Sequence, residues 1–292
     1  MQVGAAIVAS RFVVAEVPPL TLAMLRYAVG FLCLLPFAWS ALRGGSMAER
    51  ASPVGRSFSG DLLAMAALGI GQFGVLIALL NVGLRHVGAA QAAMIFSLFP
   101  LLTLLLAAAL GREKVTPSLL LGVLLSLVGV ALSLLPKLGA GAGDGSGWWG
   151  ELAIAASALT GALCSVLYRP YLQRYPTVPV SAFAMLASVA VLAVLALAEG
   201  WPSLITGLSG QAWAVVGFIG FSSGVGYFLW LYALKHESPT RVTVFLALNP
   251  VTAAVLGAVL LDEPFTAWAL AALVLIALGL GLATRPTPAG ER

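Results

Sequence analysis

Charged side chains are scarce in this chain: only 9% of its 292 residues are Asp, Glu, Lys or Arg, whereas 61% are hydrophobic. Soluble domains carry roughly 25% charged residues and about 45–50% apolar ones, so a water-soluble globular fold is excluded. The apolar runs are continuous, which excludes a transmembrane β-barrel, whose strands alternate in polarity over about ten residues. The remaining class is an all-α integral membrane protein built from transmembrane helices.

Cysteine and histidine are also rare. The two cysteines, Cys33 and Cys164, fall inside predicted spans, where small buried side chains are a better interpretation than a disulfide or a metal pair. The two histidines, His86 and His236, are expected at helix ends. The sequence therefore predicts no metal site and no cofactor. The net charge of +4 is explained by membrane topology, so no nucleic-acid partner is expected.

Polar residues, prolines and glycines divide the chain into ten apolar segments, each a candidate for a membrane-spanning helix of ~20 residues. The predicted helices cover residues 1–14, 19–42, 62–84, 88–110, 117–136, 149–171, 179–199, 211–234, 239–261 and 265–284. The first is short, because a helix over residues 1–14 rises only about 21 Å against a hydrocarbon core of about 30 Å. We therefore expect the first helix to be incomplete.

Basic residues gather on one side of the predicted membrane. Eleven of the 15 Lys and Arg residues fall in the loops and tail on the side that holds both termini. Because cytoplasmic loops carry an excess of Lys and Arg, both termini are predicted to be cytoplasmic. The expected location is the lipid bilayer of a bacterial inner (plasma) membrane, as a multi-pass protein.

The two halves of the chain are related in sequence. A shift of 150 residues aligns residues 81–136 without a gap, pairing Pro100 with Pro250, Glu113 with Glu263 and Gly129 with Gly279. The predicted units are a first five-helix repeat (1–136), a Gly-rich linker (137–148), a second five-helix repeat (149–286) and a tail (287–292). Five is an odd number, so the second repeat enters the membrane from the opposite side. Inverted repeats are associated with transporters that bind substrate between their halves.

The repeated Pro–Glu–Gly spacing occurs together with two characteristic stretches, VPPLTLAMLRYAVG at 17–30 and LYALKHESPTRVTVFLALNPVTAAVLGAVLLDEPFT at 231–266. With these motifs, essentially the whole chain resembles the EamA-type branch of the drug/metabolite transporter superfamily. The resemblance implies a ten-helix exporter or permease of amino acids, other metabolites or drugs. It does not indicate one substrate, and the short first helix departs from the family pattern.

Polar side chains inside spans are costly and tend to face the interior of a bundle. We expect a small-molecule substrate to bind in a central cavity lined by Arg26, Gln72, Ser97, Thr160, Tyr168, Tyr227, Trp230 and Asn249. Arg26 is expected either to bind a substrate carboxylate or to reach outward and pair with Glu16. The alternative for the neutral residues is interhelical hydrogen bonding, and Ser and Thr can also bond to the backbone of their own helix.

Pro100 and Pro250 are predicted near the middle of two spans, where proline frees the carbonyls of Phe96 and Leu246. Each is expected to act as a hinge near the site or as a plain packing kink. Glu113 and Glu263 come just before the fifth and tenth spans, and the sequence predicts that they stabilise the starts of those helices.

Two strings resemble enzyme motifs. Gly69–Gly74 matches GxGxxG and Gly220–Gly224 matches GxSxG, but both lie inside predicted spans, where small residues let helices approach closely.

The primary hypothesis is a permease that is not an enzyme and works by alternating access, as a monomer or a homodimer. The alternatives are an intramembrane serine hydrolase using Ser222 or Ser223, and a non-transporting membrane subunit.

Overall fold

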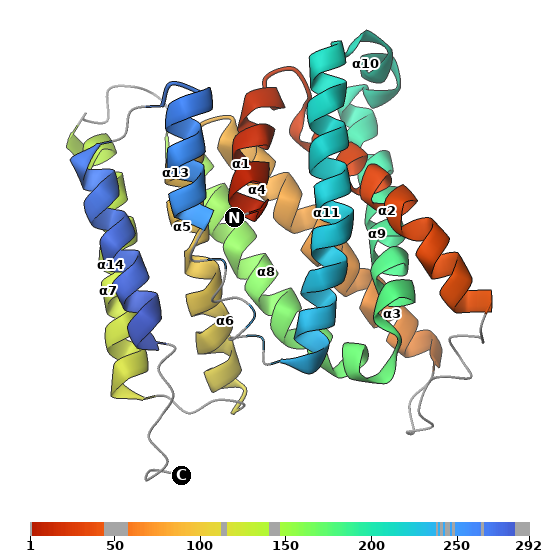
Figure 1. Cartoon of the computed structure of the whole chain (residues 1–292), viewed down its shortest axis with the longest axis horizontal. Helices are drawn as coiled ribbons and strands as arrows, with labels where there is room; N and C mark the ends of the chain where they lie inside the picture. Colours follow the sequence, from red (N-terminus) through yellow and green to blue (C-terminus); the bar gives the residue numbers. More distant parts are fainter. Residues whose placement is uncertain are drawn as a thin grey trace.

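The protein is a bundle of helices that run broadly side by side (Figure 1). The computed structural model describes residues 2–43, 58–111, 116–139, 147–237, 239, 242, 246, 249–263 and 266–283. Within these ranges every regular element is a helix and there is no strand, which confirms the predicted all-α class.

The helices follow the predicted apolar segments closely. Those of the first half are α1 (Gln2–Val13), α2 (Pro19–Arg43), α3 (Phe58–Gly69), the π-helix η1 (Ile70–Val75), α4 (Leu76–Leu84), α5 (Ala89–Phe96), α6 (Leu98–Ala109) and α7 (Pro117–Gly139). Those of the second half are α8 (Trp149–Arg174), α9 (Thr177–Leu195), the 3-10 helix η3 (Ala196–Glu199), α10 (Trp201–Gly207), α11 (Gly210–His236), α13 (Asn249–Leu260) and α14 (Ala267–Ala283).

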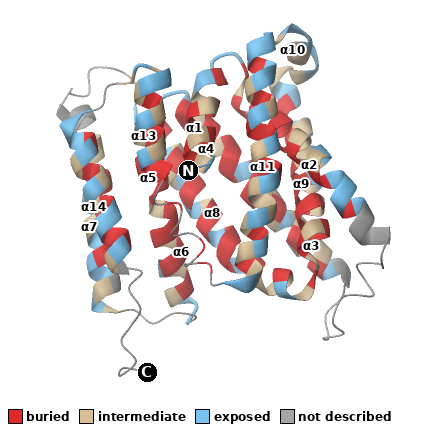
Figure 2. Ribbon diagram, in the orientation of Figure 1, coloured by how far each residue is buried: buried red, intermediate tan, exposed pale blue. Residues whose placement is uncertain are grey.

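Six helical stretches are long and apolar enough to cross a membrane: Pro19–Trp39, Gly60–Leu84, Ala89–Ala109, Trp149–Arg174, Thr177–Glu199 and Gly210–His236. Shorter apolar helices cover Gln2–Val13, Leu120–Leu134, Asn249–Leu260 and Ala267–Leu282. Many large apolar side chains point outward, including Leu63, Trp149 and Val259, each at least 70% exposed. An apolar exterior on a helical bundle is the surface that a lipid bilayer requires. Buried residues instead concentrate on the inward faces of α4, α5 and α8 (Figure 2).

Three details differ from the predicted segments. The span predicted at 88–110 is interrupted at Ser97, because Pro100 has no N–H to donate to the carbonyl of Phe96. The short helix α10 was not predicted. The first ten residues of the helix predicted at 239–261 lie mostly outside the described residues, and the remainder is described as α13 (Asn249–Leu260).

Helices far apart in sequence pack together in the middle of the bundle. α2 packs against α9 and α11, α8 packs against α4 and α6, and α13 packs against α1 and α5. α7 and α14 form a pair at one edge of the molecule (Figure 1). The centre is therefore built from elements of both halves of the chain.

Glycines mark the closest helix contacts. A Cβ atom added to Gly224 of α11 would lie 2.8 Å from the carbonyl oxygen of Gly30 in α2, so the two backbones are in direct contact. Gly69 likewise lies against Ala184 of α9, where an added Cβ would be 2.7 Å from the Ala184 Cα. The two glycine-containing strings thus pack helices together, as the sequence predicted.

The role predicted for Glu263 needs correction. Its carboxylate accepts hydrogen bonds from the backbone N–H groups of Ala89 (2.8 Å) and Ala90 (3.2 Å), at the start of α5 and not of α14. The start of α14 is instead capped by the Thr266 hydroxyl, which accepts from Ala269 N. The difference arises because α13 packs against α5, which places the loop after α13 over the start of α5. Glu113 lies outside the described residues.

Candidate functional site

A cavity of ≈ 290 Å³ lies between α1, α2, α11 and the residues around the start of α13. Four of the predicted site residues line it, namely Arg26, Tyr227, Trp230 and Asn249. A smaller hollow of ≈ 40 Å³ shares Arg26, Tyr227 and Trp230 with it and adds a fifth, Gln72. The structure thus brings together five of the eight residues predicted to bind substrate.

Arg26 is the one charged residue on the wall of the cavity among the described lining residues. It is only 4% exposed, and its Nε donates a hydrogen bond of 2.6 Å to the Ser223 hydroxyl on α11. Within the described ranges no carboxylate lies within 4 Å of its guanidinium. The predicted alternative partner, Glu16, instead accepts hydrogen bonds from Ser209 N and Oγ. The guanidinium therefore keeps donor capacity for a group in the cavity.

Gln72 lies in the π-helix η1, the widened turn between α3 and α4. The side chain is 2% exposed, and its Oε1 has no hydrogen-bond partner among the described residues. The backbone at η1 packs tightly, since a Cβ on Gly71 would meet the Cys164 sulfur at 2.8 Å. π-turns are rare and often occur at functional sites. Here the turn presents a buried amide to the smaller hollow.

Asn249 and Trp230 contribute two more polar groups. Asn249 is 2% exposed at the first position of α13, and neither its Nδ2 nor the Trp230 Nε1 has a hydrogen-bond partner in the described part of the chain. Buried polar groups are normally satisfied. Unpaired donors on a cavity wall are therefore available to a ligand or to water.

The two aromatic residues on the wall, Tyr227 and Trp230, pack against other aromatic rings. Tyr227 packs edge-on against Phe73 with ring centroids 4.7 Å apart, and lies 5.5 Å from the ring of Tyr27. Trp230 lies 5.9 Å from Phe99. The cavity thus combines one cation and neutral hydrogen-bonding groups with apolar faces, a composition typical of small-molecule sites.

The other three predicted site residues do not line either cavity. The hydroxyls of Ser97 and Thr160 donate to backbone carbonyls of their own helical stretches, Met94 and Ala156. The Tyr168 hydroxyl donates to the Met65 carbonyl at 3.2 Å. Their hydrogen bonds are local or interhelical, so these side chains serve packing in this conformation.

The two predicted hinge prolines occupy different settings. Pro100 is buried in α6, just after the break at Ser97. Pro250 is the second residue of α13 as described, and residues 247 and 248 before it lie outside the described ranges. The break at Ser97 supplies a place where this span can bend, while the hinge at Pro250 stays a prediction.

Gln2 is a polar residue of the cavity wall that was not predicted from the sequence. Its Nε2 donates to both the hydroxyl (2.8 Å) and the carbonyl of Ser222. An amide at the start of an apolar segment is a weak signal, because helix ends commonly carry polar residues.

Comparison with known proteins identifies the family. The sequence profile of the EamA-like transporter family matches residues 2–135 and, a second time, residues 148–285. The chain belongs to this family. An uncharacterized transporter of Archaeoglobus fulgidus is 27% identical over 285 residues, which cover 97% of this chain and 94% of the relative.

Further relatives of this EamA-like protein also carry transporter names. The uncharacterized transporter YyaM of Bacillus subtilis is 26% identical and covers 72% of this chain and 69% of its own length. A probable terminal-alkyne amino-acid exporter of Streptantibioticus cattleyicolor is 28% identical, over 75% of this chain and 72% of its own. A solved structure aligns with a TM-score of 0.67 at 23% identity, over 96% of this chain and 94% of that one, which supports the fold alone.

The family and the site both point to a membrane transporter rather than an enzyme. The Ser223 hydroxyl donates to the Ile219 carbonyl and accepts from Arg26, while the Ser222 hydroxyl accepts from Gln2. Among the described residues no hydrogen bond joins either serine to a histidine or a carboxylate. A serine nucleophile needs such a base within hydrogen-bond reach, so the EamA-like site does not support the hydrolase alternative.

Proposed function

We propose that this EamA-like transporter is a permease that exports small organic metabolites by alternating access to the cavity around Arg26. The substrate class that fits best is a carboxylate-bearing molecule with an apolar portion, such as an amino acid or a drug-like amphiphile. The observation that carries this proposal is the buried guanidinium of Arg26, which has no acidic partner in the described part of the chain. Arg binds carboxylates in a bidentate manner, and burial strengthens that interaction.

The proposed architecture is ten membrane-spanning helices in two inverted five-helix repeats, 1–136 and 149–286, joined by the linker 137–148 and followed by the tail 287–292. The two separate matches of the family profile support this division. The packing partners support it as well. α1 contacts α13 and α11, and its counterpart α8 contacts the counterparts of those helices, α5, α6 and α4. In the same way α2 contacts α11, and its counterpart α9 contacts α3. Exchanging the two halves therefore preserves the pattern of helix contacts, as an internal pseudo-twofold axis requires.

We also propose that both termini are cytoplasmic, in a bacterial inner membrane. The basic side chains Arg174 and Lys235 near the ends of α8 and α11 support this orientation, because these ends lie on the side of the molecule where α14 ends (Figure 1). In this orientation the starts of α2, α5 and α11 face the periplasm.

The proposal is tested by ligand binding and by transport with the same variants. Purified protein is screened by thermal shift against amino acids, other carboxylates and neutral or cationic amphiphiles, since a ligand of the folded state raises apparent stability. The compounds that bind are then assayed for movement down a gradient in proteoliposomes. We expect a carboxylate-containing class to bind and to be transported, and we expect Arg26→Gln to weaken its binding by at least about tenfold.

Arg85→Gln is the matched control, because Arg85 is exposed in the loop after α4 and lines neither cavity. Equal loss in both variants, or preferential binding of cations, would contradict the carboxylate assignment. Binding without any transport in proteoliposomes would favour the non-transporting subunit.

A further inference from the structure

The cavity extends toward one end of the bundle only. On α11 its described lining runs from Ser223 to Ala233, in the C-terminal half of the helix, and on α1 it comprises Gln2, Val3 and Ala6 at the beginning. The start of α11 and the end of α1 contribute no lining residue among those described. The cavity is therefore closed off from the end of the bundle where α11 begins.

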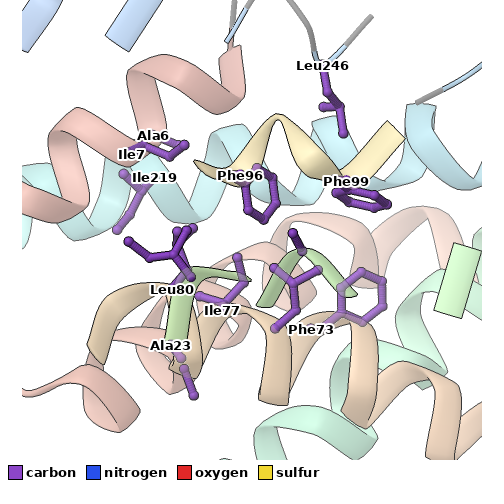
Figure 3. Close-up of a cluster of buried hydrophobic side chains, with 14 of the residues drawn as sticks. Ala6, Ile7, Ala23, Phe73, Ile77, Leu80, Phe96, Phe99, Ile219 and Leu246 are labelled. Carbon is purple, nitrogen blue, oxygen red and sulfur yellow. The ribbon is translucent and has the colours of Figure 1, made fainter. Parts of the chain in front are cut away.

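An apolar layer separates the cavity from that end. Ile7, Ile77, Leu80, Phe96 and Ile219 come from α1, α4, α5 and α11 and gather in one cluster (Figure 3). Each is between 0% and 4% exposed. We call these five residues the apolar plug. All of them except Ile219 also line the smaller hollow, so the apolar plug forms its apolar wall. Such a layer opposes the passage of a polar molecule in this conformation.

Beyond the apolar plug, three carboxylates join parts of the chain that are distant in sequence. Glu199, at the end of η3, accepts from Leu20 N (3.1 Å), Thr21 N (2.7 Å) and the Thr21 hydroxyl (2.8 Å) at the start of α2. Glu263, after α13, accepts from two N–H groups at the start of α5, as described above. Both residues belong to the second half of the chain and cap helices of the first half.

The third carboxylate makes the reverse connection. Glu16, in the loop between α1 and α2, accepts from Ser209 N (2.7 Å) and the Ser209 hydroxyl (3.0 Å). Ser209 is the N-cap residue of α11, and its hydroxyl accepts from Ala212 N. A residue of the first half thus holds the start of a helix of the second half. Such bonds are favourable because a carboxylate complements both the free N–H groups and the positive end of a helix.

Arg11 makes additional contacts between helices at the same end of the bundle. Its Nη1 donates to the Leu84 carbonyl at the end of α4 (2.7 Å), and its Nε lies 3.9 Å from the Glu263 Oε1. It therefore links α1, α4 and the carboxylate that caps α5. If the halves move relative to each other, these connections must break for the apolar plug to open.

We infer that Glu16, Glu199 and Glu263 form the gate that holds one mouth of the cavity closed, the mouth that faces the periplasm in the proposed orientation. This inference rests on the proposed function, because a gate has meaning only if the cavity opens alternately. The carboxylates are gating residues that act through the helices they cap, and they do not touch the substrate.

The test measures opening directly, without using transport. Cys33 and Cys164 are replaced by Ala, Ile219→Cys is introduced as a reporter in the apolar plug, and whole cells are treated with a charged, membrane-impermeant maleimide. Glu199→Gln and Glu263→Gln are then added singly and together. Each is close in shape to the native residue but removes the charge. We expect the labelling rate to rise by roughly fivefold to thirtyfold per cap, the effect of 1–2 kcal/mol on a two-state equilibrium.

Asp262→Asn is the matched control. Asp262 is exposed directly beside Glu263 and has a positive φ of 52°, a conformation that Asn tolerates. This change removes the same charge from the same loop without removing a cap, so the labelling rate should stay unchanged. A parallel set of variants uses Leu80→Cys as the reporter, in case Ile219→Cys disturbs folding. Labelling in inverted vesicles tests the possibility that this end of the bundle faces the cytoplasm.

The outcomes separate the gate from the proposed function. Faster labelling in the Gln variants, but not in Asp262→Asn, supports the gate even if no substrate is found. Unchanged labelling with both reporters, in cells and in inverted vesicles, overturns the gate even if wild-type protein transports a carboxylate.

Discussion

Arg26 on α2 and Ser223 on α11 are separated by 197 residues in sequence, yet the Arg26 Nε donates to the Ser223 hydroxyl at 2.6 Å. This bond lies where the two helices are in backbone contact, at Gly30 and Gly224. The absence of side chains at the crossing lets α11 approach α2 closely enough for a short Ser side chain to reach the guanidinium. The crossing therefore fixes the orientation of the one charged group on the described cavity wall.

Replacing Ser223 tests whether it positions Arg26 or acts as a nucleophile. In Ser223→Ala the guanidinium loses one neutral acceptor and keeps its charge, so we expect substrate binding to weaken by less than about tenfold, a smaller effect than that of Arg26→Gln. Affinity is measured by thermal shift over a range of ligand concentrations. A fluorophosphonate probe should label neither the wild type nor the variant. Labelling that disappears in Ser223→Ala would instead support the hydrolase.

The close helix crossing predicts that two Gly→Ala changes on α11 differ in their effect on thermal stability. Gly224→Ala places a Cβ about 2.8 Å from the Gly30 carbonyl oxygen and 3.0 Å from its Cα, so α2 and α11 must move apart. We expect a loss of about 1–3 kcal/mol, as is typical of overpacking. Gly217→Ala on the same helix is the control, because an added Cβ there meets nothing within 4 Å. Thermal melting in detergent should rank Gly224→Ala well below Gly217→Ala, and equal melting would refute the contact.

The helices could be located from the sequence because the thickness of a bilayer sets the length of each apolar run. The interruption at Ser97 followed in part from Pro100, whose effect on the Phe96 carbonyl depends only on local geometry. The site was harder to predict. Thr160 was predicted to line the cavity, yet it lines neither hollow and its hydroxyl bonds to its own backbone. The rotation of each helix is decided by packing that no single segment encodes.

The acidic residues illustrate the same limit. A position before a helix indicates a cap, and Glu263 does cap a helix, but the helix belongs to the other half of the chain. Local sequence patterns can identify the chemistry of a group. They cannot identify its partner when the partner is brought in by the tertiary fold.

The neutral cavity residues give a prediction of their own. Gln72→Ala and Asn249→Ala each remove a buried amide, and one polar atom of each amide has no partner in the described ranges. If these atoms bind substrate, each change should weaken binding by roughly threefold to tenfold while leaving the unliganded melting temperature nearly unchanged. Ser97→Ala is the control, since its hydroxyl is bonded to Met94. A ligand-induced shift that persists in both amide variants would remove these residues from the site.

The opposite end of the bundle is held by Asp61 at the start of α3, which accepts from the Tyr175 hydroxyl at 3.0 Å and lies 3.4 Å from the Arg174 Nη1. Asp61 is 6% exposed, whereas the Arg174 side chain is 32% exposed, so the ion pair is partly screened by solvent. We expect Asp61→Asn to keep the hydrogen bond from Tyr175 and to cost less than about 1 kcal/mol at low salt.

Salt distinguishes the two contributions of Asp61. The ion pair with Arg174 weakens as ionic strength rises, so the melting temperatures of wild type and Asp61→Asn should converge between low and high salt. Asp61→Ala removes the acceptor of the Tyr175 hydroxyl as well, and a hydrogen bond is little affected by screening. Its deficit should therefore persist at high salt. If the melting temperatures of wild type and Asp61→Asn do not converge at high salt, α3 and α8 are not joined at this end through the charge of Asp61.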